Sequence, residues 1–327
     1  MRQSLPKTVA LARDLLELAD RDKDPAKRAV AHRALGYSLF VAGELREAIE
    51  ILDKGAALAD TIPDRVFAVY GEHPSMVCRA YAGQARILMG FPESGARLID
   101  GAVLHARQQR NAHSLAWALG VAAHSFQTHD PAVADRFASE TISIAQEHRL
   151  PQWLALGEAS KGSAIHALGD FEGGLSLLQQ GVRRWKETGA VLHLTHWELS
   201  LAEAYLVQCQ TALVQEHVGR ARAHSDTHGE KYLASEITRL EALLLQRQGL
   251  SIALVKQCLA NAVGIAHEQG ARLLELRSTT LLARVLAENS DRRMAIEMLA
   301  PIYEWFTEGF DTADLSAARG LLDQLSY

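Results

Sequence analysis

The sequence has few cysteines, few aromatic residues and no long apolar run. Its three cysteines, Cys78, Cys209 and Cys258, lack metal-binding or redox spacing, so we expect small buried side chains in a reducing compartment. The longest apolar run, residues 115–123, is far shorter than the roughly 20 residues that a transmembrane helix needs. Charged residues interrupt the N-terminal stretch, which excludes a signal-peptide core. These absences predict a soluble, cytoplasmic protein.

Clusters of charge and strand-like patterns are also missing. The net charge is −5 and the pI about 6.3, with lysine and arginine spread along the chain. Nucleic acids and anionic membranes attract clustered basic side chains, so we expect neither as a partner. With 48% hydrophobic but only 6% aromatic residues, the apolar fraction is mainly alanine and leucine. Both are good helix formers, and alternating runs of Val, Ile and Thr are absent, which predicts an all-α protein.

What the sequence does contain is a repeated helix–turn–helix unit, clearest at residues 164–182. Gly169 can adopt the left-handed conformation that ends the first helix, and Asp170 can cap the second. Gly174 and Gly181 are small where two helices must cross, and Leu178 belongs to the apolar stripe. Two short helices cannot bury their apolar faces alone, so the unit requires stacked copies of itself.

The copies recur at a spacing near 40 residues. The turn residues are Gly43, Gly90, His129, Gly169, Cys209, Gly249 and Ser290, with successive spacings of 47, 39, 40, 40, 40 and 41. Five residues after each turn lies the expected helix crossing, at Ala48, Gly95, Ala134, Gly174, Val214, Leu254 and Ala295. The expected fold is therefore all-α: a right-handed α-solenoid of about seven tetratricopeptide-like helix pairs with an extra helix at each end.

Residues 1–327 are expected to form one elongated superhelical domain in which each unit touches only its neighbours. Residues 1–22 read as a half-repeat or a capping helix: either a lone helix caps the array, or the chain is a piece of a longer protein, which we favour. Residues 310–325 are expected to form a C-terminal capping helix. The long first spacing predicts an irregular loop near residues 62–74, which packs Phe67 and Tyr70 on the solenoid edge.

The C-terminal segment 299–315 has the sequence LAPIYEWFTEGFDTADL. It resembles the close of the tetratricopeptide-like C-terminal region of bacterial multidomain signalling proteins. These proteins join a class III adenylate/guanylate cyclase or another output domain to an AAA-type or signal-transduction ATPase. Shorter pieces at 31–36, 70–74, 90–92 and 151–155 also match, so the resemblance covers roughly residues 10–325.

The resemblance implies a regulatory or partner-sensing role, with catalysis in other domains. A phosphate-binding Gly-x-x-x-x-Gly-Lys-Ser/Thr motif is absent from this sequence, and the nearest string, at 161–163, lacks the preceding glycine. ATP binding and cyclase activity are therefore not assigned to any residue of this chain.

Candidates for chemistry are weak. The pairs His193/His196 and His224/His228 have helical ligand spacing, but neither has a third ligand nearby. Acid–base schemes could be built from Glu140, Glu147 and His148, although a solvated helix face explains these residues better. We therefore expect no catalytic residue, no cofactor and no metal site.

The inner side of the solenoid is the better candidate for binding. First-helix residues are expected to line a concave groove; they are Arg33, Tyr37, Gln84, His166, His196, Glu203, Arg239, Arg277 and Arg284. Such a lining suits a peptide or acidic segment, although an ordinary polar face is the simpler alternative. The expected partner is a protein or peptide segment, possibly an upstream ATPase or cyclase domain.

Two other functions stay open. The groove could bind a small molecule, as sensor domains of related ATPase regulators do. The chain could also be an enzyme, which only scattered His and Glu residues favour.

Overall fold

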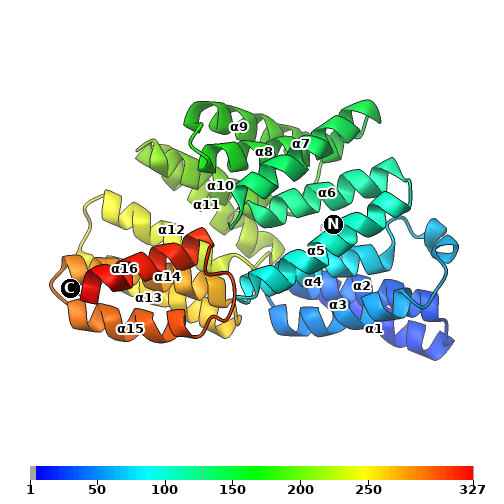
Figure 1. Cartoon of the computed structure of the whole chain (residues 1–327), viewed down its shortest axis with the longest axis horizontal. Coiled ribbons are helices and arrows are strands. Elements are labelled where there is room, and N and C mark those ends of the chain that lie inside the picture. Colours follow the sequence, from blue (N-terminus) through cyan, green and yellow to red (C-terminus); the bar gives the residue numbers. More distant parts are fainter. Residues whose placement is uncertain (1–4, 128, 327) are drawn as a thin grey trace.

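A computed structural model describes residues 5–127 and 129–326, and these residues form sixteen α-helices, one short 3-10 helix and no strand (Figure 1). The even-numbered helices from α2 to α14 pack against one another in order along the inside of the array. Their bounds are α2 (Pro25–Ala42), α4 (Pro74–Leu88), α6 (Ala112–Phe126), α8 (Pro151–Ala167), α10 (Leu194–Val207), α12 (Ala234–Arg247) and α14 (Arg272–Glu288). The all-α solenoid is confirmed.

Each inner helix pairs with the outer helix that follows it. The outer helices are α3 (Leu45–Ala59), α5 (Pro92–Gln108), α7 (Pro131–Glu147), α9 (Phe171–Glu187), α11 (Thr211–His228), α13 (Ile252–Glu268) and α15 (Arg292–Glu304). Within the described residues this gives seven helix pairs, flanked by α1 (Leu5–Asp22) and α16 (Ala313–Ser326). None of the helices in this part of the chain combines the length and apolar character that a bilayer crossing needs.

The turns inside the pairs lie where the sequence predicts them. The four turn glycines have φ values of 86° (Gly43), 94° (Gly90), 107° (Gly169) and 71° (Gly249). Cys209 and Ser290 adopt the same left-handed conformation, at 57° and 66°, although side chains disfavour it. Cys209 occupies such a turn and is exposed, and Cys258 is only partly buried, so the prediction of buried cysteines is correct for Cys78 alone.

The crossing between α8 and α9 is as close as its glycines predict. A Cβ on Gly174 would lie 2.5 Å from the backbone N of His166, and one on Gly181 would lie 2.2 Å from that of Ala159. Leu178 is 1% exposed beside this contact.

The sixth pair departs from the predicted register, because Leu254 is 49% exposed. Helix α13 begins three residues after its turn glycine, whereas α9 begins two residues after its own. The extra residue moves Val255 and Leu259 into the core in place of the predicted positions.

The irregular connection after α3 contains the 3-10 helix η1 (Asp64–Val69). Phe67 is 1% exposed and packs with Ala26, Ala29 and Ala59, while the ring centroid of Tyr70 lies 6.4 Å from that of Phe67. The loop therefore covers the edge of the first helix pair, as expected.

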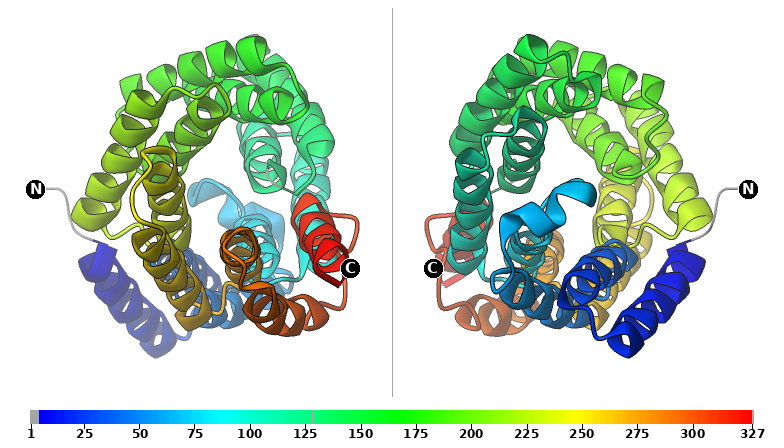
Figure 2. Two further views of the ribbon diagram at one scale, coloured as in Figure 1. Left: turned by 90° about the vertical axis from the view of Figure 1, so that its left-hand side faces the viewer. Right: turned by 90° about the vertical axis from the view of Figure 1, so that its right-hand side faces the viewer.

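The array is not elongated, since it curves through a full turn and its last pairs meet its first (Figure 2). The backbone N–H groups of Lys231 and Tyr232 donate to the carbonyl oxygen of Val41 at 2.8 and 3.4 Å, and the rings of Phe40 and Tyr232 lie 4.9 Å apart. Seven pairs are enough for the curvature to bring distant units together, so the expectation that each unit touches only its neighbours is wrong.

A reciprocal pair of hydrogen bonds, here called the clasp, joins the ends of this turn. Ser94 N–H, at the start of α5, donates to Glu308 Oε1 at 2.9 Å, and Gly309 N–H donates to Glu93 Oε1 at 3.1 Å. Each carboxylate thus satisfies a backbone N–H of the other segment, and Glu308 caps a helix N-terminus. The segment 299–315, which carries the family resemblance, therefore supplies half of the closure.

Candidate functional site

Inside the turn, the inner helices line three hollows that share some of their lining residues. The largest, the aromatic chamber, has a volume of about 550 Å³ and lies between α2, α4, α6, α8 and the α9–α10 connection. A smaller hollow of about 70 Å³, here called the neck, is lined by Gln84, His124 and His196 among others and shares His124 with the aromatic chamber. A polar chamber of about 440 Å³ shares Ser200, Glu203 and Arg277 with the neck. The chambers have the size of small-molecule sites.

The aromatic chamber is lined by three of the five tryptophans of the chain. Its aromatic residues are Tyr37, Tyr81, Trp117, Trp153 and Trp185. The rings of Tyr37 and Tyr81 lie 4.4 Å apart, and those of Tyr81 and Trp117 meet edge to face at 6.0 Å. Aromatic walls of this kind bind apolar bodies and cations, and their rigid rings lose little entropy on binding.

The sequence analysis missed this chamber, although a signal for it exists. Tyr37, Tyr81, Trp117 and Trp153 precede their turn residues by 6, 9, 12 and 16 positions. Each step of three or four residues is one helical turn on the same face. The aromatic residues thus form a diagonal stripe across four inner helices, which a search at constant repeat positions cannot detect.

Three imidazoles lie together where the linings of the aromatic chamber and the neck meet. The ring of His124 lies 5.0 Å from that of His193 and 4.0 Å from that of His196. Burial lowers the pKa of His193 to about 4, and burial with the nearby His193 lowers that of His196 to about 3. Burial also holds the pKa of His124 well below its usual value. The three rings are therefore neutral at pH 7.

The start of α10 positions two of these rings, those of His193 and His196. His193 has a left-handed backbone (φ 66°). Its N–H and that of Thr195 donate to Glu230, at 2.7 and 3.1 Å. Glu230 is 1% exposed and serves as the cap that α10 lacks locally. His193 therefore precedes the first turn of α10, so it does not share a helix face with His196 as their spacing suggests. It lines the aromatic chamber instead.

Arg33 and Glu72 bring opposite charges to the aromatic chamber. Arg33 Nη1 donates to the backbone carbonyl oxygen of Glu72 at 2.8 Å, and no ion pair among the described residues involves Arg33. The Glu72 carboxylate lies 3.6 Å from His113 Nδ1 and is 26% exposed. A guanidinium and a carboxylate are therefore neighbours on the chamber wall without neutralising each other directly.

The polar chamber is bordered by a charge ladder, which we define as Glu203, Glu236, Arg239, Arg277 and Asp314. Arg239 bonds to Glu236 at 2.8 Å and to Glu203 at 2.5 Å; Arg277 bonds to Glu236 at 3.0 Å and to Asp314 at 2.7 Å. Glu203 comes from α10, Glu236 and Arg239 from α12, Arg277 from α14 and Asp314 from α16, so the ladder ties three successive inner helices to the flanking helix α16. Its cations already have carboxylate partners.

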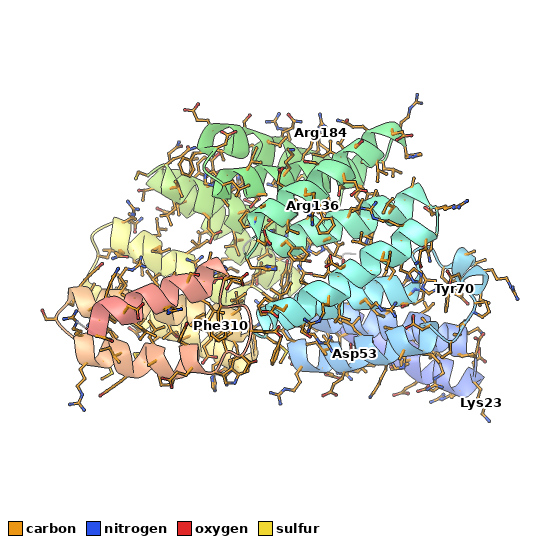
Figure 3. The ribbon with its side chains drawn as sticks, in the orientation of Figure 1. Lys23, Asp53, Tyr70, Arg136, Arg184 and Phe310 are labelled. Carbon is orange, nitrogen blue, oxygen red and sulfur yellow. The ribbon has the colours of Figure 1, made fainter. Side chains whose placement is uncertain are left out.

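The predicted groove residues are distributed over these spaces. Arg33 and Tyr37 line the aromatic chamber, Gln84 and His196 the neck, His166 and Arg239 the polar chamber, and Glu203 and Arg277 both of the latter two. Arg284 is exposed and lines none of the three, because it lies two helical turns beyond Arg277 along α14. The other candidates lie outside the interior: Arg107 pairs with Glu140 at 2.5 Å, and Glu147 and His148 are exposed. Figure 3 labels Asp53 of α3 and Arg184 of α9, two charged side chains of the outer helices that pair with Arg86 and Glu158 of the inner helices, each at 2.6 Å.

One cluster has metal-ligand composition, since ligand atoms of Asp64, His73 and His105 lie within 4.8 Å of one another. Ser75 N–H donates to His73 Nδ1 at 3.2 Å, so the proton of the neutral ring is on Nε2. That nitrogen faces Asp64 Oδ1 at 3.5 Å. In this protonation state Nε2 carries a proton and has no lone pair to offer a metal ion, although it makes no hydrogen bond within the described residues.

No protein-family model matches the chain, and no curated protein matches it. Solved structures share the fold. Aspartyl phosphate phosphatase F from Bacillus subtilis is 13% identical with a TM-score of 0.55, over 88% of this chain and 73% of that one. The apo form of RapI is 13% identical with a TM-score of 0.55, over 88% of this chain and 99% of that one. A Rap protein complexed with Competence and Sporulation Factor is 10% identical with a TM-score of 0.57, over 98% of this chain and 96% of that one. Likeness at this identity establishes the helical-repeat fold alone.

Proposed function

We propose that this chain is a non-catalytic regulatory module of tetratricopeptide type, which binds a protein or peptide segment inside its superhelical turn. The observation that carries the proposal is the interior itself: successive inner helices line chambers of about 550 and 440 Å³, with the neck between them sharing residues with each. A structural neighbour was solved in complex with Competence and Sporulation Factor, which supports ligand binding by this architecture.

The finer proposal is that the module regulates a signalling ATPase or nucleotide cyclase, in the same polypeptide or as a partner. It rests on the resemblance of segment 299–315, which forms half of the clasp. Closure of the turn through this segment offers a simple switch, because a partner that binds one end would compete with two hydrogen bonds.

Size-exclusion chromatography tests this proposal with the purified chain and the ATPase or cyclase domains of its own genome. The expected result is a complex that Ser200→Trp, which fills the neck and polar chamber, weakens at least tenfold. The matched outer variant Arg284→Trp should bind normally. Absence of any complex, or equal binding by both variants, would argue against an interior partner site.

The aromatic chamber favours a second candidate function, sensing of a small molecule. Its walls are contributed by four successive inner helices and by the α9–α10 connection, so a bound ligand would bridge units that otherwise pack only side by side. A ligand at 100 times its Kd should stabilise the chain by about 2.7 kcal/mol. Thermal-shift measurements detect such an effect.

A further inference from the structure

The ligand class of the aromatic chamber can be read from the charges at its wall. Most of its lining is aromatic or aliphatic, yet Arg33 and Glu72 are both present. A purely anionic ligand would meet the Glu72 carboxylate, and a purely cationic one would meet the Arg33 guanidinium. The wall therefore favours a ligand head that carries both charges.

The geometry keeps the two charges available. Arg33 is held by the carbonyl oxygen of Glu72 at 2.8 Å, which uses one of its five N–H donors. The Glu72 carboxylate turns toward His113, at 3.6 Å, a pairing that requires a protonated imidazole. Arg33 and Glu72 both line the chamber and form no ion pair with each other, so the guanidinium and the carboxylate can each bind one group of a zwitterion.

A second feature points to a ligand. His124 is 5% exposed and lines the chamber, and neither of its ring nitrogens has a hydrogen-bond partner within the described residues. A buried polar group without a partner costs free energy, which a ligand donor or acceptor would recover. Tyr81 and Trp117 form the aromatic wall beside it.

We propose that the aromatic chamber binds a small zwitterion with a large aromatic body, such as an aromatic amino acid or a derivative of one. Arg33 binds the carboxylate, Glu72 binds the ammonium group, and the body packs between Tyr81, Trp117 and Trp153. His124 hydrogen-bonds a polar atom of the body. This inference deepens the small-molecule function proposed above and does not depend on a protein partner.

Three probes separate the sources of such a head group. Free L-tryptophan carries both charges, N-acetyl-L-tryptophan only the carboxylate of a peptide C-terminus, and L-tryptophanamide only the ammonium of a peptide N-terminus. Titration calorimetry of the full chain up to about 10 mM probe should give the tightest binding for free tryptophan, by at least fivefold over each of the others. Equal or tighter binding of either blocked form would overturn the zwitterion assignment, as would no binding of any probe.

Charge-neutral variants add an internal check. Arg33→Gln should weaken tryptophan and the N-acetyl form at least fivefold but leave the amide unchanged, and Glu72→Gln should do the converse. The exposed Arg284→Gln is the matched control and should bind all three probes as the parent does. Circular dichroism confirms that the variants fold. Loss of binding without this crossed pattern would overturn the assigned roles, and the chromatography described above would still test the protein-binding function separately.

Discussion

Replacing Glu236 by glutamine should destabilise the fold more than the same substitution at any surface carboxylate. Glu236 is 4% exposed and accepts hydrogen bonds from two guanidinium groups, that of buried Arg239 at 2.8 Å and that of partly buried Arg277 at 3.0 Å. Breaking a buried ion pair from one side typically costs 3–5 kcal/mol. Arg239 keeps Glu203 and Arg277 keeps Asp314, so we expect the lower end of that range, about 3 kcal/mol.

Urea unfolding followed by circular dichroism and by tryptophan fluorescence measures this loss, and coincidence of the two curves checks two-state behaviour. The matched control is Glu297→Gln, which removes an exposed ion pair with Arg293 (side chains 50% and 91% exposed) and should cost less than about 1 kcal/mol. The reasoning fails if both variants lose the same free energy of unfolding.

The same substitution has a pH signature. Burial alone would raise the pKa of Glu236, but Arg239 and Arg277 lower it to about 2 from an ordinary 4.5. The stability that ionised Glu236 contributes is therefore full above pH 4.5 and is lost as the pH falls toward 2. The difference in free energy of unfolding between the parent and Glu236→Gln should shrink as the pH falls through that window. A difference that stays constant with pH would contradict the ion-pair explanation.

Three further effects follow from the packing. Gly174→Leu should cost about 1–3 kcal/mol in urea unfolding because the α8–α9 crossing has no room for a side chain, and Gly264→Leu, whose Cβ would meet nothing within 4 Å, should not. Gly90→Ala should open the turn and increase the radius of gyration in X-ray scattering, since its Cβ would lie 2.7 Å from Trp305; Gly169→Ala, equally left-handed but with nothing nearby, should leave it unchanged. Stability should fall as the pH drops from 6.5 toward 4, because His193, His196 and His124 gain protons more readily in the unfolded chain, and His193→Gln should make that slope shallower in pH-dependent melting curves.

The repeat could be predicted from the sequence because its signals are local. Turn residues such as Gly43 and Gly169 and crossing residues such as Gly174 are dictated by backbone conformation and contact within one unit. Closure of the superhelix could not be predicted this way. The contact of Phe91 with Trp305, 5.5 Å between ring centroids, depends on small rotations summed over all the units between them.

In the candidate site, too, local features could be predicted from the sequence and contacts between units could not. A residue's place on the inner face follows from helical periodicity, which is why Tyr37 and Arg239 do lie inside. Whether a charged residue there is available depends on its neighbours: Arg239 is occupied by Glu236, whereas Arg33 makes no ion pair among the described residues. Glu236 lies three residues from Arg239 on α12, but the further partners of this pair, Glu203 and Arg277, belong to neighbouring repeats, so spacing within one unit reveals only part of the network.

The central claim, that partners bind inside the turn, is tested most directly by photo-crosslinking in cells. A benzophenone amino acid is placed at Ser200, which lines the neck and the polar chamber, or at exposed Arg284. The account predicts a protein adduct from position 200 and none from position 284. An adduct from position 284 alone, or from neither position, would contradict it.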